Sequence, residues 1–330
     1  IFLTNAKHNI HTVYADSTIC ELEQIAGTDS VIYDENDIRQ SSSSFKDVRY
    51  IFSTWGIPSF TSDEIKVIFP SLECVFYAAG SVQWFARTFL ECGVRVFSAW
   101  EANAVPVAEY TVSQIILANK MFYTLSRLMS SGNVSQAREL ASNIVGNYGK
   151  KIGIIGAGTI GKLVIKMLKE YHLEVAVFDP FLSKDTAFAL GVTKCSLEEL
   201  FSSCQVVSNH LANNDATKEM LNGKLFERMP PYATFINTGR GAQVVESELI
   251  DALKARADLT AVLDVTEPEP PVEGSPFFAL PNCILTPHIA GSLGDELHRM
   301  SQYMLKEYKS YIAGNLCRYE VTKEMLETMA

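Results

Sequence analysis

The stretch Lys151-Ile-Gly-Ile-Ile-Gly-Ala-Gly-Thr-Ile-Gly161 contains a short apolar run that leads directly into three glycines. The run Ile152–Ile155 predicts a buried strand, and the residues from Lys162 onward have the periodicity of a helix. In this spacing, the first glycine allows a tight turn, the second lets a diphosphate approach the backbone, and the third lets helix and strand pack closely. The stretch therefore predicts a turn that binds a dinucleotide at a helix N-terminus.

An acid after the next predicted strand indicates which dinucleotide binds. Val175–Phe178 is a second apolar run, and Asp179 stands at its end. A carboxylate at this place hydrogen-bonds the ribose diol of NAD and repels the 2′-phosphate of NADP, so we expect NAD as the cofactor. The cofactor contacts expected in this part of the chain are Gly156, Gly158, Thr159, Ile160 and Asp179.

Composition limits the class of protein. The chain has 330 residues, of which 47% are apolar and 20% charged, as expected for a globular protein with two domains of ordinary size. A net charge of −10 argues against nucleic acid as a partner, and no apolar run reaches the roughly 18 residues of a membrane-spanning helix. The seven cysteines include no Cys-x-x-Cys pair, which favours reduced thiols in the cytoplasm over disulfides or a metal site.

The order of apolar runs predicts an open α/β architecture. Strand-like runs alternate with polar or helical segments through the first hundred residues, and the pattern resumes at Lys151. An X-Pro boundary is expected within Trp100–Pro106, followed by one long helix from about Val107 to Met129. A final helix is expected from His298 to about Ala313. The predicted strands are Ile1–Leu3, Val31–Tyr33, Tyr50–Ser53, Cys74–Tyr77, Val94–Phe97, Ile152–Ile155, Val175–Phe178, Gln205–Ser208, Ala233–Ile236, Ala261–Leu263 and Cys283–Leu285.

Three polar clusters each follow a predicted strand, where ligands bind in open α/β sheets. They are Asn237-Thr-Gly-Arg-Gly241, Leu263-Asp-Val-Thr-Glu-Pro-Glu-Pro270 and Leu285-Thr-Pro-His-Ile-Ala-Gly-Ser292. An arginine between two glycines can bind a carboxylate through two parallel hydrogen bonds. A histidine can exchange a proton near neutral pH, and a nearby carboxylate would orient it and favour its protonated form. Together these groups suit the reduction of a 2-oxo acid.

These motifs, with the glycine turn and Asp179, resemble the D-isomer-specific 2-hydroxyacid dehydrogenase family over roughly residues 70 to 310. The resemblance implies that Arg240 polarises the substrate carbonyl and binds its carboxylate. It further implies that His288 is the general acid/base and that Glu269 pairs with it. Asp264 corresponds to the family residue near the nicotinamide carboxamide. His210, a rival for the acid role on residue type alone, is placed with Thr238 among the cofactor contacts.

The resemblance also implies an architecture. A Rossmann-type NAD-binding domain, residues 103–292, is expected as an insertion in a flavodoxin-like substrate-binding domain, residues 1–102 plus 293–330. Backbone amides of Gly80, Ser81 and Val82 are expected to hold the substrate carboxylate. The family's equivalent of the helix from Val107 builds a two-fold dimer, so a homodimer is expected.

Three readings of function stay open at this point. The general one is an NAD-dependent D-2-hydroxyacid dehydrogenase that acts as a 2-oxoacid reductase. A narrower one is a phosphoglycerate dehydrogenase or a glyoxylate/hydroxypyruvate reductase. The third is an NAD(H)-sensing binding protein, because the family's fold also serves a transcriptional corepressor.

Overall fold

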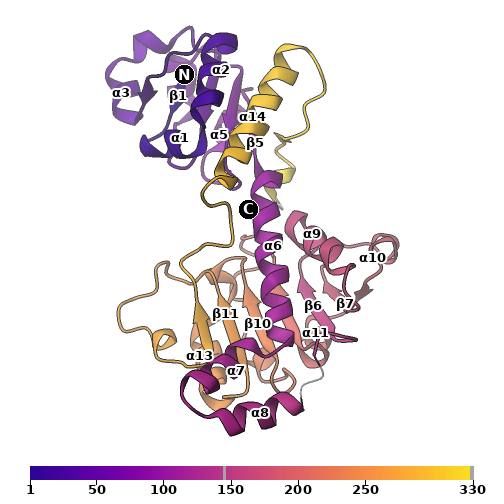
Figure 1. The fold of residues 1–330 in the computed structure, drawn as a ribbon. Helices are drawn as coiled ribbons and strands as arrows, with labels where there is room; N and C mark the ends of the chain where they lie inside the picture. The colour runs from indigo at the N-terminus through magenta and orange to yellow at the C-terminus, as the bar shows by residue number, and fades with distance from the viewer. Residues whose placement is uncertain (144–145, 328–330) are drawn as a thin grey trace. The chain divides into compact units, whose positions relative to one another are not determined.

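The computed structural model describes residues 1–143 and 146–327, which form two compact units (Figure 1). Unit 1 contains Ile1–Ala104 and Ser292–Ala330, and unit 2 contains Val105–Gly291. Unit 2 is thus inserted between the two chain segments that make up unit 1. The boundaries expected from the sequence, after residues 102 and 292, differ from these by one or two residues.

Unit 1 is built on a six-stranded sheet with the order β13-β5-β4-β3-β1-β2. The first five strands of the chain pair in parallel in the flavodoxin-like order 2-1-3-4-5, and β13 adds to β5 in the antiparallel sense. The strands are β1 (Phe2–Leu3), β2 (Ile32–Tyr33), β3 (Tyr50–Ser53), β4 (Cys74–Tyr77), β5 (Arg95–Ser98) and β13 (Glu320–Val321). The sequence pattern did not predict β13.

Helices cover both faces of this sheet. One face packs against α3, η1, α4 and α5, and the other against α1, α2 and the C-terminal helix α14. On the second face, the ring of Phe76 stacks between Phe52 and Phe97 and meets Tyr308 of α14 edge-on, so α14 is part of the core. The helices are α1 (His8–Val13), α2 (Asp16–Ala26), α3 (Glu35–Gln40), η1 (Ser42–Phe45), α4 (Ser62–Ile68), α5 (Ala86–Glu91), α14 (Glu296–Ile312) and η4 (Met325–Glu327).

Unit 2 is built on a seven-stranded, wholly parallel sheet with the order β12-β11-β10-β9-β6-β7-β8. Numbered within the unit this order is 7-6-5-4-1-2-3, which extends the Rossmann arrangement, so the predicted fold class is confirmed. The order reverses between β6 and β9. The strands are β6 (Lys151–Ile155), β7 (Glu174–Phe178), β8 (Thr193–Lys194), β9 (Val206–Asn209), β10 (Thr234–Asn237), β11 (Thr260–Leu263) and β12 (Cys283–Leu285). The pattern missed the exposed two-residue strand β8.

Two apolar layers enclose the sheet of unit 2. One is formed by α6 and α9, and Figure 1 shows α6 lying across that face of the sheet. The other is formed by α11, α12 and α13. The helices are α6 (Trp100–Asn119), α7 (Phe122–Ser130), α8 (Val134–Ser142), α9 (Thr159–Leu168), α10 (Lys184–Leu190), α11 (Leu197–Ser203), α12 (Gly223–Phe226), η2 (Gly241–Gln243), α13 (Glu246–Ala255) and η3 (Pro276–Phe278).

The helix expected from Val107 to Met129 is wrong in its bounds. Helix α6 begins at Trp100 and runs through Pro106, because burial of Ala104 and Val107 on either side outweighs the hydrogen bond that a proline cannot donate. The expected X-Pro boundary is therefore not a helix boundary. The helix ends at Asn119, and Met121 in the left-handed conformation (φ 49°) separates it from α7.

None of the helices in residues 1–143 and 146–327 combines the length and apolar content needed to cross a membrane. All seven cysteines are free thiols. Burial raises the pKa of Cys74 to about 12 and that of Cys204 to about 11, so both stay protonated and act as small core residues.

Candidate functional site

The glycine turn after β6 has the geometry that the sequence predicts. Gly156 adopts φ +88°, where a side chain is strained. A Cβ on Gly161 would lie 2.0 Å from the Gly156 carbonyl oxygen, so only glycine lets α9 start this close to β6. A Cβ on Gly158 would meet nothing within 4 Å, and no side chain caps the N-terminus of α9. The first turn of α9 thus presents backbone N–H groups to open space, which fits a diphosphate.

Asp179 is placed beside this turn. One of its carboxylate oxygens accepts a hydrogen bond from the Ala157 N–H at 2.7 Å. The other accepts from the backbone of Phe181 and Leu182, at 2.8 and 3.1 Å. The side chain therefore joins the glycine turn to the loop after β7 and stands where a ribose diol would meet it.

The turn Thr238-Gly239-Arg240-Gly241, the Arg240 turn, follows β10. The guanidinium is half-buried, and its Nη1 donates to the Gly239 carbonyl at 2.7 Å. Burial lowers the pKa of Arg240, and the Glu269 carboxylate opposes that shift, so the two side chains act on each other. A Cβ on Gly241 would lie 2.0 Å from the carbonyl carbon of Thr266. Glycine at 241 thus lets the Arg240 turn pack directly on the segment that leads to Glu269.

His288 and Glu269 form a pair. Nδ1 of His288 lies 2.6 Å from a carboxylate oxygen of Glu269, and both side chains keep substantial exposure. The contact orients the imidazole and leaves Nε2 as the ring nitrogen for a substrate. His288 also adopts φ +56°, a conformation that is rare for a residue with a side chain. Arg240, Glu269 and His288 therefore converge, although they come from three separate turns.

Asp264 holds the turn that carries His288. Its carboxylate accepts hydrogen bonds from the Thr286 hydroxyl at 2.6 Å, the Ile289 N–H at 2.8 Å and the Ala290 N–H at 2.8 Å. Its backbone carbonyl accepts from the His288 N–H at 3.1 Å. Asp264 is almost fully buried. The contacts it makes in this structure are those of an anchor for the His288 turn.

His210 is too buried to serve as an acid. Its side chain contacts Ser208 at 3.0 Å through Nε2 and Thr238 at 3.4 Å through Nδ1. Burial lowers its pKa to about 3, so the ring is neutral near pH 7. Thr238 is buried as well and also reaches Thr111 of α6 at 3.4 Å. His210 and Thr238 thus lie together beside the glycine turn, where a Cβ on Gly156 would meet the His210 carbonyl.

In unit 1, the segment Gly80–Val82 follows β4 at the carboxyl end of the sheet. Within the described residues, the backbone N–H groups of Gly80, Ser81 and Val82 donate no hydrogen bond. One polar side chain that the sequence patterns did not single out, that of Asn103, accompanies this segment. Nδ2 of Asn103 lies 3.6 Å from the position of a Cβ on Gly80, and Oδ1 of Asn103 accepts from the Ser292 N–H at 3.0 Å. This cluster of donors suits an anion.

The sequence also did not predict several residues in unit 2 that support the site. Tyr110 of α6 contacts Thr286 at 3.1 Å, which extends the hydrogen bonds around Asp264 back to that helix. Asn209 and Gln243 support the Arg240 turn from beneath. Asn237 and Thr286 belong to the polar clusters 237–241 and 285–292, but nothing in a single sequence distinguishes their roles from those of their neighbours.

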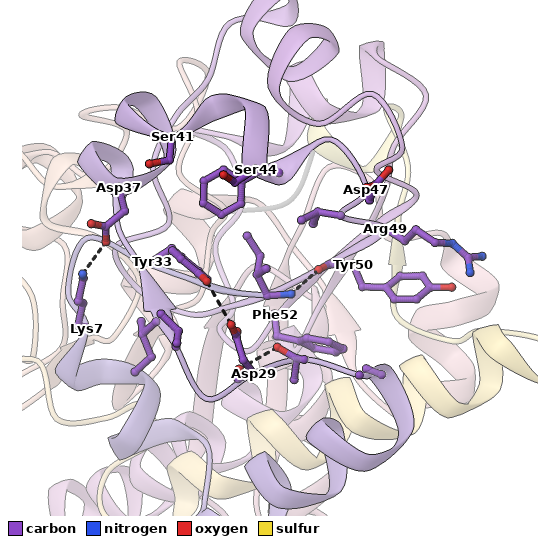
Figure 2. Close-up of a pocket in the computed structure, with 18 of the residues that line it drawn as sticks. Lys7, Asp29, Tyr33, Asp37, Ser41, Ser44, Asp47, Arg49, Tyr50 and Phe52 are labelled. Carbon is purple, nitrogen blue, oxygen red and sulfur yellow. Dashed lines mark hydrogen bonds and ion pairs between the residues drawn. The ribbon is translucent and has the colours of Figure 1, made fainter.

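A cavity of about 840 Å³ lies elsewhere in unit 1, along the edge strand β2 (Figure 2). Lys7, on its wall, is paired with Asp34 and Asp37. Figure 2 also shows the Tyr33 hydroxyl bonded to Asp29. Arg49 is paired with Glu73. Because these charged groups already have partners, the cavity suggests no ligand.

Solved structures confirm the class of fold. The chain matches D-mandelate dehydrogenase from Rhodotorula graminis with a TM-score of 0.80 at 20% identity, over 98% of this chain and 97% of that one. It matches a phosphoglycerate oxidoreductase from Rhizobium etli with a TM-score of 0.79 at 21% identity, over 98% of each chain. The class is therefore that of two-domain α/β proteins with a Rossmann-type nucleotide domain.

The sequence comparison identifies the family. The family described as D-isomer specific 2-hydroxyacid dehydrogenase, NAD binding domain, matches residues 112–290, more than half of the chain. The chain belongs to this family, and this region is its NAD-binding domain. The D-3-phosphoglycerate dehydrogenase of Archaeoglobus fulgidus is 31% identical over 61% of this chain and 37% of its own length. The D-3-phosphoglycerate dehydrogenase of Bacillus subtilis is 30% identical over 67% of this chain and 42% of its own length. The chain thus spans about two fifths of the length of these relatives.

The glycine turn generates a test with a matched pair of variants. Gly158→Ala is expected to keep the wild-type melting temperature, because its methyl group enters open space, but to weaken NADH binding by about tenfold or more by obstructing the diphosphate. Gly161→Ala is expected to lower both the melting temperature and the affinity for NADH, because its methyl group meets the Gly156 carbonyl. Thermal melts and NADH fluorescence titrations measure the two effects. Wild-type NADH affinity in Gly158→Ala would contradict the assignment.

The buried His210 makes stability depend on pH. Its folded pKa of about 3 lies below the ordinary value of 6.5, so between these pH values the unfolded chain binds a proton that the folded protein does not. The free energy of unfolding should therefore fall as pH decreases from about 6.5, by at most about 1.4 kcal/mol per pH unit from this residue. In urea unfolding at pH 7, 5 and 4, His210→Gln is expected to lose stability less steeply than wild type. If the free energy of unfolding fell equally steeply in wild type and in His210→Gln, the neutral, buried state of the His210 ring would be contradicted.

Proposed function

We propose that this protein is an NAD-dependent oxidoreductase that interconverts 2-oxo acids and D-2-hydroxy acids. The observation that supports it most is the convergence of Arg240, Glu269 and His288, with Nδ1 of His288 2.6 Å from Glu269. When bound, NADH supplies the hydride for carbon 2 of the oxo acid. The Nε2–H of protonated His288 donates its proton to the carbonyl oxygen, and Glu269 stabilises the cation through Nδ1. The D configuration rests on family membership.

Two groups are proposed to bind the substrate carboxylate and carbonyl. The Arg240 guanidinium binds the carboxylate and polarises the carbonyl, because a half-buried cation with parallel N–H donors favours a planar anion. The backbone amides of Gly80, Ser81 and Val82, which donate to no other group among the described residues, are proposed to bind the carboxylate as well. Residues 1–102 with 293–330 accordingly serve as the substrate-binding domain, and residues 103–292 as the nucleotide-binding domain.

NAD is proposed over NADP. Asp179 keeps a carboxylate beside the glycine turn, where it repels a 2′-phosphate and accepts from a ribose diol. His210, Thr238 and Asp264 line the same end of the sheet as the glycine turn and are proposed as further cofactor contacts. The Asp264 carboxylate already accepts three hydrogen bonds, so it would contact the cofactor through the lone pairs that these bonds do not use.

The substrate is proposed to lack a phosphate group. The segments after β3 and β4, residues 54–60 and 78–86, contain no lysine or arginine, and they expose the indole rings of Trp55 and Trp84. Arg87, the next cation, is paired with Glu327. Of the narrower alternatives, D-3-phosphoglycerate oxidation is supported by the names of the relatives, and glyoxylate/hydroxypyruvate reduction is left to the substrate screen. The corepressor-like alternative predicts NADH binding without turnover.

An NADH-oxidation screen with variants tests the proposal. The panel contains glyoxylate, pyruvate, hydroxypyruvate, phosphohydroxypyruvate and bulkier aryl or branched 2-oxo acids. On the best substrate, His288→Ala is expected to lower kcat by about 10²- to 10⁴-fold through loss of the proton donor. Arg240→Ala is expected to raise KM and lower kcat, because the carboxylate loses its partner. Wild-type turnover in either variant contradicts the site, and preference for phosphohydroxypyruvate contradicts the proposed substrate class.

A homodimer is proposed, with α7 on its interface. The helix from Val107, whose equivalent in the family suggested a dimer, is part of α6, and its residues Val112, Ile115 and Ala118 are buried inside unit 2. Helix α7 instead buries none of its residues and leaves Phe122 and Met129 about half-exposed. Sedimentation is expected to show a dimer that Met129→Glu shifts toward monomer, whereas Phe188→Glu on the exposed face of α10 leaves it intact. A monomeric wild type contradicts this proposal.

The cytoplasm is the proposed location. The support is that all seven cysteines are free and that burial raises the pKa of several of them, as in proteins kept in a reducing compartment. Small molecules are the proposed ligands. A net charge of −10 argues against nucleic acid and anionic membranes as partners.

A further inference from the structure

Three side-chain amides form a buried cluster beneath the Arg240 turn. Asn209 ends β9, Asn237 ends the neighbouring strand β10, and Gln243 lies in η2 just after the turn. Each is at most 1% exposed. Because β9 and β10 pair with Asn209 opposite Asn237, two of the amides start from adjacent positions in the sheet. Buried amides are kept only where their hydrogen bonds are satisfied.

The cluster holds the Arg240 backbone from both sides. Oε1 of Gln243 accepts from the Arg240 N–H at 3.1 Å, and Nδ2 of Asn237 donates to the Arg240 carbonyl at 3.1 Å. Oδ1 of Asn237 also accepts from the Gly239 N–H at 3.1 Å. Nδ2 of Asn209 links the other two amides by donating to Asn237 at 3.0 Å and to Gln243 at 2.7 Å. The guanidinium therefore extends from a backbone with little freedom to move.

The same cluster holds the segment after His210. Nε2 of Gln243 donates to the carbonyl oxygens of Leu211 and Ala212, both at 2.9 Å. Oδ1 of Asn209 accepts from the Leu211 N–H at 3.2 Å. This segment lies against the glycine turn, since a Cβ on Gly156 would lie 3.1 Å from the Leu211 nitrogen. Gln243 thus uses both of its donors on the nucleotide side and its acceptor on the Arg240 side.

We propose that Gln243 is a positioning residue that couples dinucleotide binding, beside the segment Leu211–Ala212, to substrate-carboxylate binding by Arg240. The inference rests on the proposed function for the identity of the two ligands. Gln243 touches neither ligand in this scheme. A ligand that orders one of the two segments orders the other through a single amide, so each ligand binds more tightly in the presence of the other.

The coupling is measured without turnover. NADH is titrated by fluorescence into the full chain with and without saturating oxamate, an unreactive analogue of a 2-oxo acid. In the wild-type protein, oxamate is expected to tighten NADH binding by about tenfold, within the usual range for coupled sites. Gln243→Met has a similar shape but no amide, and is expected to reduce that factor to about twofold or less.

A control variant separates coupling from general loss of stability. Asn282 is also a buried amide in unit 2, and its Nδ2 donates to the carbonyls of Leu253, Arg256 and Leu259. Asn282 directly precedes β12, whereas the Arg240 turn follows the carboxyl end of β10. Asn282→Leu is expected to lower the melting temperature while keeping the wild-type coupling factor. Equal loss of coupling in both variants, or full coupling in Gln243→Met, overturns the inference.

Gln243→Glu adds a readout that a purely structural role would not change. A protonated glutamic acid keeps an acceptor for Arg240 and one donor, whereas the carboxylate faces the two carbonyl oxygens of Leu211 and Ala212. The coupling factor of this variant, relative to wild type, is expected to fall as pH rises through the pKa of the new carboxyl. A ratio that does not change with pH contradicts the proposed contacts.

The outcomes also distinguish this inference from the proposed function. Wild-type protein that reduces a 2-oxo acid but shows no coupling between NADH and oxamate refutes the role of Gln243 and leaves the activity standing. Coupling that depends on Gln243, without turnover of any acid in the panel, refutes the activity and leaves the positioning role standing.

Discussion

The constraint on which the site depends is the anchoring of the His288 turn by Asp264. The carboxylate at the end of β11 accepts from one side chain and two backbone groups of the segment after β12. These bonds close a turn in which His288 adopts φ +56°. Burial of Asp264 makes an unpaired acceptor costly there, so the turn has one favourable arrangement. That arrangement directs Nδ1 of His288 to Glu269.

The other groups meet His288 because neighbouring parallel strands end at the same edge of the sheet. Strands β10, β11 and β12 are consecutive in the sheet, and the turns that follow them carry Arg240, Glu269 and His288. Close approach of Gly241 to Thr266 removes the space that would otherwise separate the first two turns. The glycine turn after β6 lies two strands beyond β10, next to β9, where the strand order reverses and ligands bind in such sheets. Rigid strands thus position chemistry that mobile loops alone would not hold.

Sequence patterns predicted the strands of both units well, because buried parallel strands are continuous apolar runs such as Ile152–Ile155. They failed where local signals compete with packing. Pro106 indicates a helix boundary on local grounds, yet burial of its neighbours keeps α6 continuous. Strands β8 and β13 have two residues each and no apolar pattern of their own. Asn209 and Gln243 resemble any polar residues in a turn, because their contacts depend on segments distant in sequence. Such contacts become visible only in three dimensions.

We propose that a hydride passes from NADH to carbon 2 of a 2-oxo acid at the site formed by Arg240, Glu269 and His288. The most direct measurement uses NADH with deuterium at both positions of nicotinamide carbon 4, because the hydride leaves from only one face, and the product is examined by mass spectrometry and NMR. The expected product is a 2-hydroxy acid with deuterium on carbon 2. A product without deuterium at carbon 2, or bound NADH that reduces no 2-oxo acid, would contradict it.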